Sequence, residues 1–147
     1  MELTYENMME HTQRYFDIIK TINPKKDPQI HNKVREFFSS DFEVRWGTPP
    51  KFNSRDEWVD HLCGHADQYI AHVLYEPDPF YIFVDDRKKM AACFVKEEMR
   101  DPVTEKLLKV FLLNVHYVFT MENNAVKFKW ELISHIPAKY SSDICPE

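Results

Sequence analysis

The feature that most constrains this chain is a long run of strand-forming residues, broken once near its middle by a short turn. Residues 107–121 are rich in β-branched and aromatic side chains, and residues 125–136 alternate apolar with charged side chains. Between them lies Glu122-Asn123-Asn124, and asparagine tolerates the left-handed backbone that tight hairpin turns need. The pattern predicts a long β-hairpin that closes a sheet.

A two-residue turn at Asn123-Asn124 fixes the pairing of these two strands. The predicted pairs are Met121 with Val126, Phe119 with Phe128, Tyr117 with Trp130 and, on the opposite side, His116 with Glu131. One side of the hairpin is apolar and holds Val115, Tyr117, Phe119, Phe128, Trp130 and Leu132. The other is mixed and holds Asn114, His116, Lys129 and Glu131 among Leu112, Val118 and Ile133. Either side can line an enclosed space, and the function depends on which one does.

Composition predicts one globular domain and argues against several classes of function. The chain has 147 residues, of which 44% are hydrophobic and 14% aromatic, enough to bury a sizeable core. It has only 2 glycines, which argues against glycine-rich phosphate loops. The net charge of −5 is spread along the chain without a basic stripe, which argues against a nucleic-acid partner. We expect a single domain over residues 1–137 and an irregular tail over residues 138–147.

The cysteines and the apolar segments bear on the cellular compartment. Cys63, Cys93 and Cys145 are odd in number and far apart, which is typical of reduced thiols in a cytosolic protein. The N-terminus has no basic region followed by an apolar run, as a secretion signal has. No apolar stretch approaches the ~18 residues of a membrane span. The sequence therefore predicts a cytoplasmic protein that does not bind a membrane.

Three helices are predicted before the strands. Thr4 is a plausible cap for a first helix that runs to about residue 21, with one apolar side. Asp27, followed by proline, starts a short second helix. Ser54 and Glu57 have the spacing of a capping box and start a third helix.

The order of the elements predicts the architecture. Strands are expected over residues 42–46, 71–75, 80–84, 90–99 and the two arms of the hairpin. Helices followed by strands indicate an α+β layer structure. A curved antiparallel sheet wrapped around the first helix would form a cone with an apolar interior, and such cavities commonly hold small molecules.

Four stretches, taken in order, carry a resemblance to a known superfamily: residues 13–15, 37–46, 52–58, and 121–126 followed by Trp130-Glu131. In this series the chain resembles the SnoaL-like, nuclear-transport-factor-2-like superfamily, which includes ketosteroid isomerases, scytalone dehydratase and polyketide cyclases. The resemblance implies a cystatin-like fold, in which a cone of three N-terminal helices packs on a curved antiparallel sheet. It also implies dehydratase, isomerase or cyclase chemistry that needs no cofactor and acts on an apolar carbonyl compound.

The resemblance also implies roles for individual residues. Tyr15 falls where the isomerases place a tyrosine that hydrogen-bonds the substrate oxygen, and their second donor falls on His116 or Tyr117, depending on the hairpin register. Glu131 matches an acidic position that can act as a general base in SnoaL-like cyclases. His72 resembles a histidine that dehydratases of the superfamily use as a base. The chain departs from the isomerase pattern at Trp46, which falls near their proton-shuttling aspartate.

Each candidate has a structural alternative. The pair His116–Glu131 suits acid–base work, because a carboxylate raises the pKa of a neighbouring imidazole and orients it. The alternative is a solvated cross-strand pair outside the sheet. His61 and His65 have HxxxH spacing, but no third ligand follows and His61 turns toward solvent, so we predict no metal site and no cofactor.

Two functional hypotheses follow from these residues. In the first, the protein is an enzyme in which Glu131 or His72 removes a proton and Tyr15, with His116 or Tyr117, stabilises the enolate. Trp46, Tyr117 and Trp130 are then the candidate substrate-binding residues. In the second, the protein is a non-catalytic small-molecule-binding or assembly subunit, with a cavity that lacks acid–base groups or with a filled cone. Both sides of the sheet are partly apolar, so we also expect a homodimer through the sheet.

Overall fold

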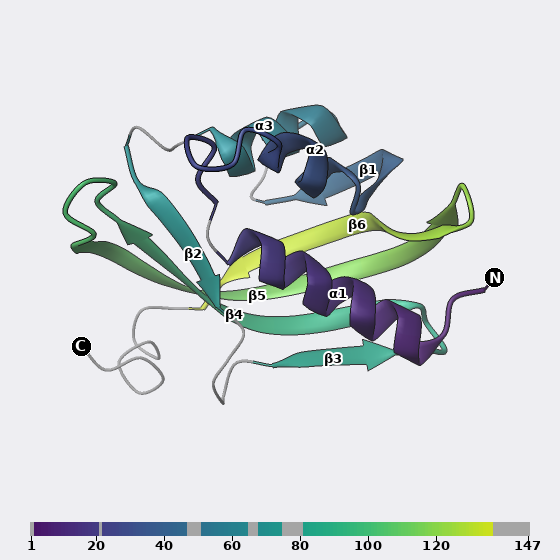
Figure 1. Ribbon diagram of the computed structural model, residues 1–147. Helices are drawn as coiled ribbons and strands as arrows, with labels where there is room; N and C mark the ends of the chain where they lie inside the picture. Colours follow the sequence, from purple (N-terminus) through teal and green to yellow (C-terminus); the bar gives the residue numbers. More distant parts are fainter. Residues whose placement is uncertain (1, 21, 47–50, 65–67, 75–80, 137–147) are drawn as a thin grey trace.

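The computed structural model describes residues 2–20, 22–46, 51–64, 68–74 and 81–136 (Figure 1). The helices are α1 (Tyr5–Ile19), α2 (Ile30–Arg35) and α3 (Arg55–Cys63). The strands are β1 (Phe38–Arg45), β2 (Ile70–Leu74), β3 (Ile82–Asp85), β4 (Met90–Arg100), β5 (Leu107–Glu122) and β6 (Ala125–His135). Each predicted helix and strand is present, although β1 begins earlier than predicted. The predicted tail over residues 138–147, with Cys145, and the predicted candidate His65 lie outside the described residues.

The strands form one curved sheet that is mixed rather than wholly antiparallel. The strand order is β1-β6-β5-β4-β2. Strand β3 pairs with the first part of β4, and β2 pairs with the second part. All pairs are antiparallel except β1 with β6, which differs from the predicted arrangement. No hairpin joins β1 to β6, because α3 and four strands separate them in sequence, and a parallel pair needs such a long crossover. Helix α1 crosses one face of the sheet, while α2 and α3 lie beside β1 (Figure 1).

Local capping fixes where α1 begins. The Thr4 hydroxyl accepts a hydrogen bond from the Asn7 backbone N–H (3.1 Å), and the Asn7 side chain accepts one from the Thr4 N–H (2.8 Å). This reciprocal pair satisfies two otherwise unpaired donors of the first turn. The buried residues of α1 recur every three or four positions and therefore share one side, which faces the sheet: Met8, His11, Thr12, Tyr15, Phe16 and Ile19.

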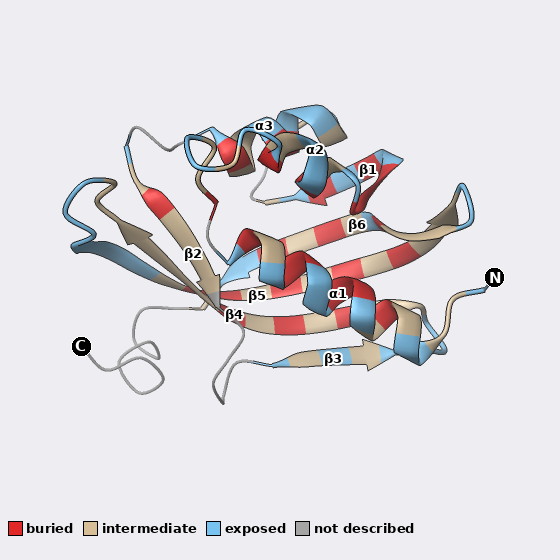
Figure 2. Ribbon diagram, viewed as in Figure 1, coloured by how far each residue is buried: buried red, intermediate tan, exposed pale blue. Residues whose placement is uncertain are grey.

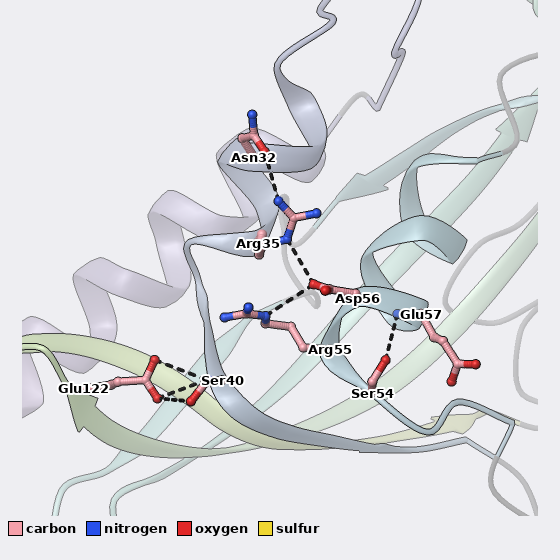
Figure 3. Close-up of polar contacts among 8 residues, drawn as sticks. All are labelled: Asn32, Arg35, Ser40, Ser54, Arg55, Asp56, Glu57 and Glu122. Carbon is pink, nitrogen blue, oxygen red and sulfur yellow. Dashed lines mark hydrogen bonds and ion pairs between the residues drawn. The ribbon is translucent and has the colours of Figure 1, made fainter.

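Polar contacts hold α3 against α2 and hold β1 against the hairpin (Figure 3). Ser54 caps α3 through the Glu57 N–H, as predicted. Arg35 of α2 donates to the Asp56 carboxylate at 3.0 Å. Near the start of β1, the Ser40 backbone N–H and the Ser40 hydroxyl both donate to the same oxygen of the Glu122 carboxylate, at 3.0 Å and 2.8 Å. The Arg35–Asp56 contact thus joins α3 to α2, and the Ser40–Glu122 contacts join β1 to the hairpin.

The hairpin turn is as predicted, but the pairing beyond Phe128 is not. Asn123 and Asn124 both have positive φ angles, 53° and 59°, which is typical of a type I′ turn. Phe119 pairs with Phe128 as predicted, but the register then shifts, and Val118 pairs with Trp130. Lys129 is therefore an extra residue, a β-bulge in β6.

The bulge corrects two predicted pairs. Tyr117 lies opposite Glu131, and His116 lies opposite Leu132, so the predicted pairs Tyr117–Trp130 and His116–Glu131 are wrong. The physical reason is the period of a strand: one extra residue moves every following side chain to the other face. Buried and less buried positions consequently alternate along β5 from Leu113 to Phe119 but change phase in β6 between Phe128 and Glu131 (Figure 2).

The narrow end of the cone is filled with aromatic rings. Phe37, Phe38, Phe119 and Phe128 are each less than 5% exposed. His11 lies among them: its ring centroid is 4.6 Å from that of Phe128 and 5.0 Å from that of Phe37. Its Nε2 lies 3.1 Å from the Phe37 carbonyl oxygen. Burial lowers the pKa of His11 from 6.5 to about 4, because the apolar surroundings disfavour the charged ring.

None of the helices in the described ranges has the length and apolar character needed to cross a membrane.

The buried His11 predicts a stability that falls in mild acid. The pKa of His11 is lower in the folded state than in the unfolded chain, so on acidification the unfolded chain binds a proton at His11 first. The contribution of His11 to the unfolding free energy is therefore complete above pH 6.5 and is lost as the pH falls toward 4. We expect His11 to account for a loss of about 2 kcal/mol in unfolding free energy between pH 7 and pH 5. Urea denaturation of the wild type and of His11→Phe at both pH values measures this loss. Equal pH dependence in the two proteins would contradict the prediction.

Candidate active site

A cavity of about 70 Å³ lies between the helices and the inner face of the sheet. Its walls come from α1, α3 and the inner side chains of β2, β4, β5 and β6. The side of the hairpin that lines it carries Val115, Tyr117, Glu131 and Ile133. The cavity is thus lined by the predicted apolar side of β5 and, after the bulge, by the predicted mixed side of β6.

The carboxyl group of Glu131 is buried in the wall of this cavity. The residue is 2% exposed, and its Oε1 has no hydrogen-bond partner within the described part of the chain. Burial raises the pKa of Glu131 well above its usual value, because the surroundings disfavour the charged form. A buried carboxyl oxygen without a partner costs free energy unless a ligand or water satisfies it.

Two tyrosines stand beside this carboxyl. Tyr15 of α1 and Tyr117 of β5 are each 1% exposed, and their ring centroids lie 6.2 Å apart. Their side chains are hydrogen-bond partners. In both residues the pKa is raised well above its usual value, first by burial and then by the nearby Glu131 carboxyl.

Aromatic packing fixes the positions of the two phenols. The Tyr117 ring stacks on Phe128 with centroids 4.1 Å apart, and the Tyr15 ring meets Phe128 edge-on at 5.2 Å. Rings held in this way from two sides keep their rotamers. The hydroxyls are therefore preorganised rather than free to follow a ligand.

Tryptophans and a histidine line another part of the cavity. Trp58 of α3 stacks on His61 with centroids 5.5 Å apart, and Trp46 meets the His61 ring at 5.6 Å. Trp46 donates from Nε1 to His135 at 3.3 Å. Trp58 is 2% exposed, and its Nε1–H has no hydrogen-bond partner among the residues that the structure describes. His61 lines the cavity, so the prediction that it turns toward solvent is wrong.

Four of the seven predicted site residues line the cavity: Tyr15, Trp46, Tyr117 and Glu131. The other three lie on the outer face of the sheet. His72 pairs in register with Glu98, while its neighbours Ala71 and Val73 face the cavity. His116 and Trp130 are turned outward by the strand period and by the bulge.

Sequence reasoning missed two polar residues of the lining, Glu97 and Tyr69. Tyr69 lies beyond α3, which ends at Cys63, and directly precedes β2. Glu97 sits in the run Lys96-Glu97-Glu98, which has the composition of a solvated strand. The only signal was the strand period, which places Glu97 on the same face as the buried Val95 and Cys93.

Comparison with known proteins gives a fold but no close relative. No family model matches the chain, and no curated protein matches it. Among solved structures, a protein with a cystatin-like fold from Caulobacter vibrioides covers 94% of this chain and 93% of its own, with a TM-score of 0.64 and 9% identity. This chain has a cystatin-like fold.

Two further neighbours among solved structures have more specific names. AusH from Aspergillus nidulans superposes with a TM-score of 0.62 and 11% identity, covering 90% of this chain and 87% of its own. A scytalone dehydratase-like protein from Novosphingobium aromaticivorans gives a TM-score of 0.60 and 15% identity, covering 90% and 83%. At these identities the likeness shows the fold alone, and it confirms the α+β fold that the sequence resemblance predicted.

Burial of Glu131 predicts a variant that is more stable than the wild type at high pH. The folded-state pKa is raised, so the stabilisation is complete below the unfolded value of 4.5 and is lost as the pH rises through the folded-state pKa. Glutamine stays neutral, and we expect Glu131→Gln to raise Tm at pH 8 by about 4 °C for each pKa unit of the shift. The gain should shrink at pH 5. Thermal unfolding at both pH values measures it, and a Tm that falls equally at both would contradict the prediction.

Proposed function

We propose that this protein is a dehydratase, isomerase or cyclase that acts on an apolar, carbonyl-bearing small molecule by acid–base chemistry of its own side chains. The observation that carries the proposal is the Glu131 carboxyl, whose Oε1 has no hydrogen-bond partner among the described residues and which is buried in the cavity wall beside Tyr15 and Tyr117. A cavity with converging acid–base groups is the expected site of such chemistry.

Glu131 is the general base in this proposal. Its carboxylate removes a proton from the carbon next to the substrate carbonyl, and the electron pair of that C–H bond moves to the carbonyl oxygen to form an enolate. The raised pKa of Glu131 supports this role, because a stronger carboxylate base removes a carbon-bound proton more readily. The low exposure of the site limits competition by water.

Tyr15 is the donor to the developing oxyanion. The hydrogen bond between the Tyr15 and Tyr117 side chains holds the two hydroxyls together, and in such a pair each hydrogen bond polarises the other group. Preorganised donors in a water-poor site stabilise an enolate more than they stabilise the ketone. A reaction that protonates the enolate at another carbon is an isomerisation, and one that expels a hydroxide from the neighbouring carbon is a dehydration.

The alternative function is non-catalytic binding or assembly. A carrier needs cavity volume without acid–base groups, and an assembly subunit needs a filled cone. The convergence of Tyr15, Tyr117 and Glu131 on one cavity favours the enzyme. The scytalone dehydratase-like neighbour supports the same choice by its name. The predicted cytoplasmic location stays a prediction.

Exchange of carbon-bound hydrogen for deuterium tests the proposed proton transfer without knowledge of the true substrate. We expect the wild type in D₂O to deuterate 2-decanone next to its carbonyl, as measured by NMR, faster than buffer does. Glu131→Gln should slow the enzyme-dependent rate by about 10²–10⁴-fold, and Tyr15→Phe by about 10²-fold.

Two exposed residues provide matched controls. Glu43→Gln makes the same chemical change on an exposed β1 residue, and Tyr5→Phe does so on the same helix as Tyr15, where the side chain is 45% exposed. Both should keep the wild-type rate. Exchange that survives both Glu131→Gln and Tyr15→Phe in folded protein would remove this mechanism and leave the carrier hypothesis.

We also propose the homodimer that the composition of the sheet predicted. The outer face, which the helices leave uncovered in Figure 1, carries an aromatic cluster of Tyr81, Phe83 and Phe94, and Phe83 is 60% exposed. Such apolar faces are typical of interfaces between subunits.

Light scattering during gel filtration tests the dimer. We expect a dimeric mass for the wild type at micromolar concentration and a monomeric mass for Phe83→Lys, because a lysine charge would be desolvated at the interface. Val103→Lys, at an 88% exposed turn residue, is the control and should stay dimeric. A monomeric wild type would contradict the proposal.

A further inference from the structure

Trp58 carries a polar group that the proposed reaction does not use. Its side chain lines the cavity from α3 and is 2% exposed. The indole Nε1–H is buried and has no hydrogen-bond partner among the residues that the structure describes. A buried N–H without a partner costs free energy. An indole nitrogen donates but does not accept, so the partner that would satisfy it is an acceptor.

The rings around Trp58 do not supply this acceptor. Phe52 and Trp46 meet the Trp58 ring edge to face, with centroids 5.1 Å and 6.0 Å away, and neither side chain has an acceptor atom. His61 stacks nearly parallel to Trp58, with an interplanar angle of 22°. In such a stack the lone pair of an imidazole nitrogen lies in the plane of its own ring and does not point at the indole N–H. The cavity that Trp58 lines is therefore where an acceptor can lie.

The Trp58 donor and the two phenols belong to separate aromatic clusters of the cavity wall. Tyr15 and Tyr117 contact each other and pack on Phe128. Trp58 packs with Trp46 in the other cluster. None of the ring contacts in the described ranges joins either tyrosine to either of these tryptophans. This separation indicates two oxygen sites in the cavity rather than one site that all the donors share.

The volume of the cavity limits the size of what it encloses. One water needs about 10–15 Å³ of such space, so a cavity of about 70 Å³ admits about five to seven water-sized groups. This is enough for a carbonyl, a short chain and one further oxygen. Among the described residues no lysine or arginine lines the cavity, whereas the Glu131 carboxyl does. A second oxygen with a negative charge is therefore unfavourable in this region of low dielectric, and an uncharged acceptor is favoured.

We infer that Trp58 determines specificity by donating a hydrogen bond to a second, uncharged oxygen of the substrate. The inference rests on the proposed function for the carbonyl end, where the carbonyl oxygen accepts from Tyr15. Within the enclosed part of the substrate, a chain of a few carbons links the two oxygens. A ketone without the second oxygen leaves the Trp58 N–H unpaired and binds more weakly.

Three ketones of equal chain length test this assignment: 2-hexanone, 1-ethoxypropan-2-one and 4-methoxybutan-2-one. In the two ethers an oxygen replaces a CH₂ group of 2-hexanone, at a different distance from the carbonyl in each. An ether oxygen accepts a hydrogen bond but cannot donate one, so it reports on the indole donor alone. NMR titration of the full-length protein measures the three affinities. We expect one ether to bind more tightly than 2-hexanone, and the ratio of these two affinities to fall about tenfold in Trp58→Phe.

The NMR signals of the indole N–H groups give a direct readout. The chain has three tryptophans, and Trp46→Phe, Trp58→Phe and Trp130→Phe assign their signals. We expect the Trp58 signal to move downfield when the favoured ether binds and to move less with 2-hexanone, because a hydrogen bond deshields the proton. If Trp58→Phe does not fold, the other two variants assign the Trp58 signal by elimination, and the shift in the wild type decides.

Trp46→Phe is also the matched control for affinity. It makes the same chemical change in the same cavity wall, but the Trp46 Nε1–H already donates to His135 at 3.3 Å. The ratio of ether to 2-hexanone affinity should therefore stay at the wild-type value. A ratio that is equal in the wild type and Trp58→Phe, a fall that Trp46→Phe reproduces, or a Trp58 signal that none of the three ketones moves would overturn the inference.

Deuterium exchange separates this inference from the proposed reaction. If the ether preference depends on Trp58 but the wild type catalyses no exchange, the specificity role stands and the reaction falls. If exchange depends on Glu131 while Trp58→Phe leaves the ratio of affinities unchanged, the reaction stands and the specificity role falls. If none of the three ketones binds, the specificity role is overturned whatever the exchange shows.

Discussion

The pairing of Tyr117 with Glu131 across the hairpin is the interaction on which the candidate site depends. It places a carboxyl in the inner face of the sheet, where water is scarce, and it does so beside the two phenols that can share in its chemistry. Desolvation of an unpaired carboxyl opposes folding. The aromatic rings packed at the narrow end offset this cost, since burial of one such side chain contributes about 1.5–3 kcal/mol.

The same rings divide the cone into two parts with different roles. At the narrow end, Phe37, Phe38 and Phe128 fill the space and hold Tyr15 and Tyr117 at fixed positions. The cavity begins where this packing stops, and it continues toward Glu97 along the inner face of the sheet. The packed rings thus hold the two tyrosines whose side chains line the cavity.

Local signals in the sequence predicted the elements well, and long-range arrangement was harder to predict. Asn123-Asn124 and Ser54 are cues that act within a few residues, and the turn and the helix start follow them. The parallel pairing of β1 with β6 has no such cue, because it joins segments about 85 residues apart that only the completed sheet brings together. The bulge at Lys129 was also invisible, since an exposed lysine fits a regular strand as well as a bulged one. Missing that one residue placed Glu131 with His116 rather than with Tyr117.

A one-residue bulge has a consequence for how such proteins diverge. Beyond Lys129, regular pairing of the same sequence without the bulge would turn Trp130 and Leu132 inward and Glu131 and Ile133 outward. A change of register with no change in length would thus remove Glu131 from the chamber and bring Trp130 into it, a change that point substitutions would make only in several steps. Homologues with and without the bulge would align column by column while their matched residues face opposite sides. Comparisons of this strand between distant relatives therefore need to be made by spatial position rather than by residue count.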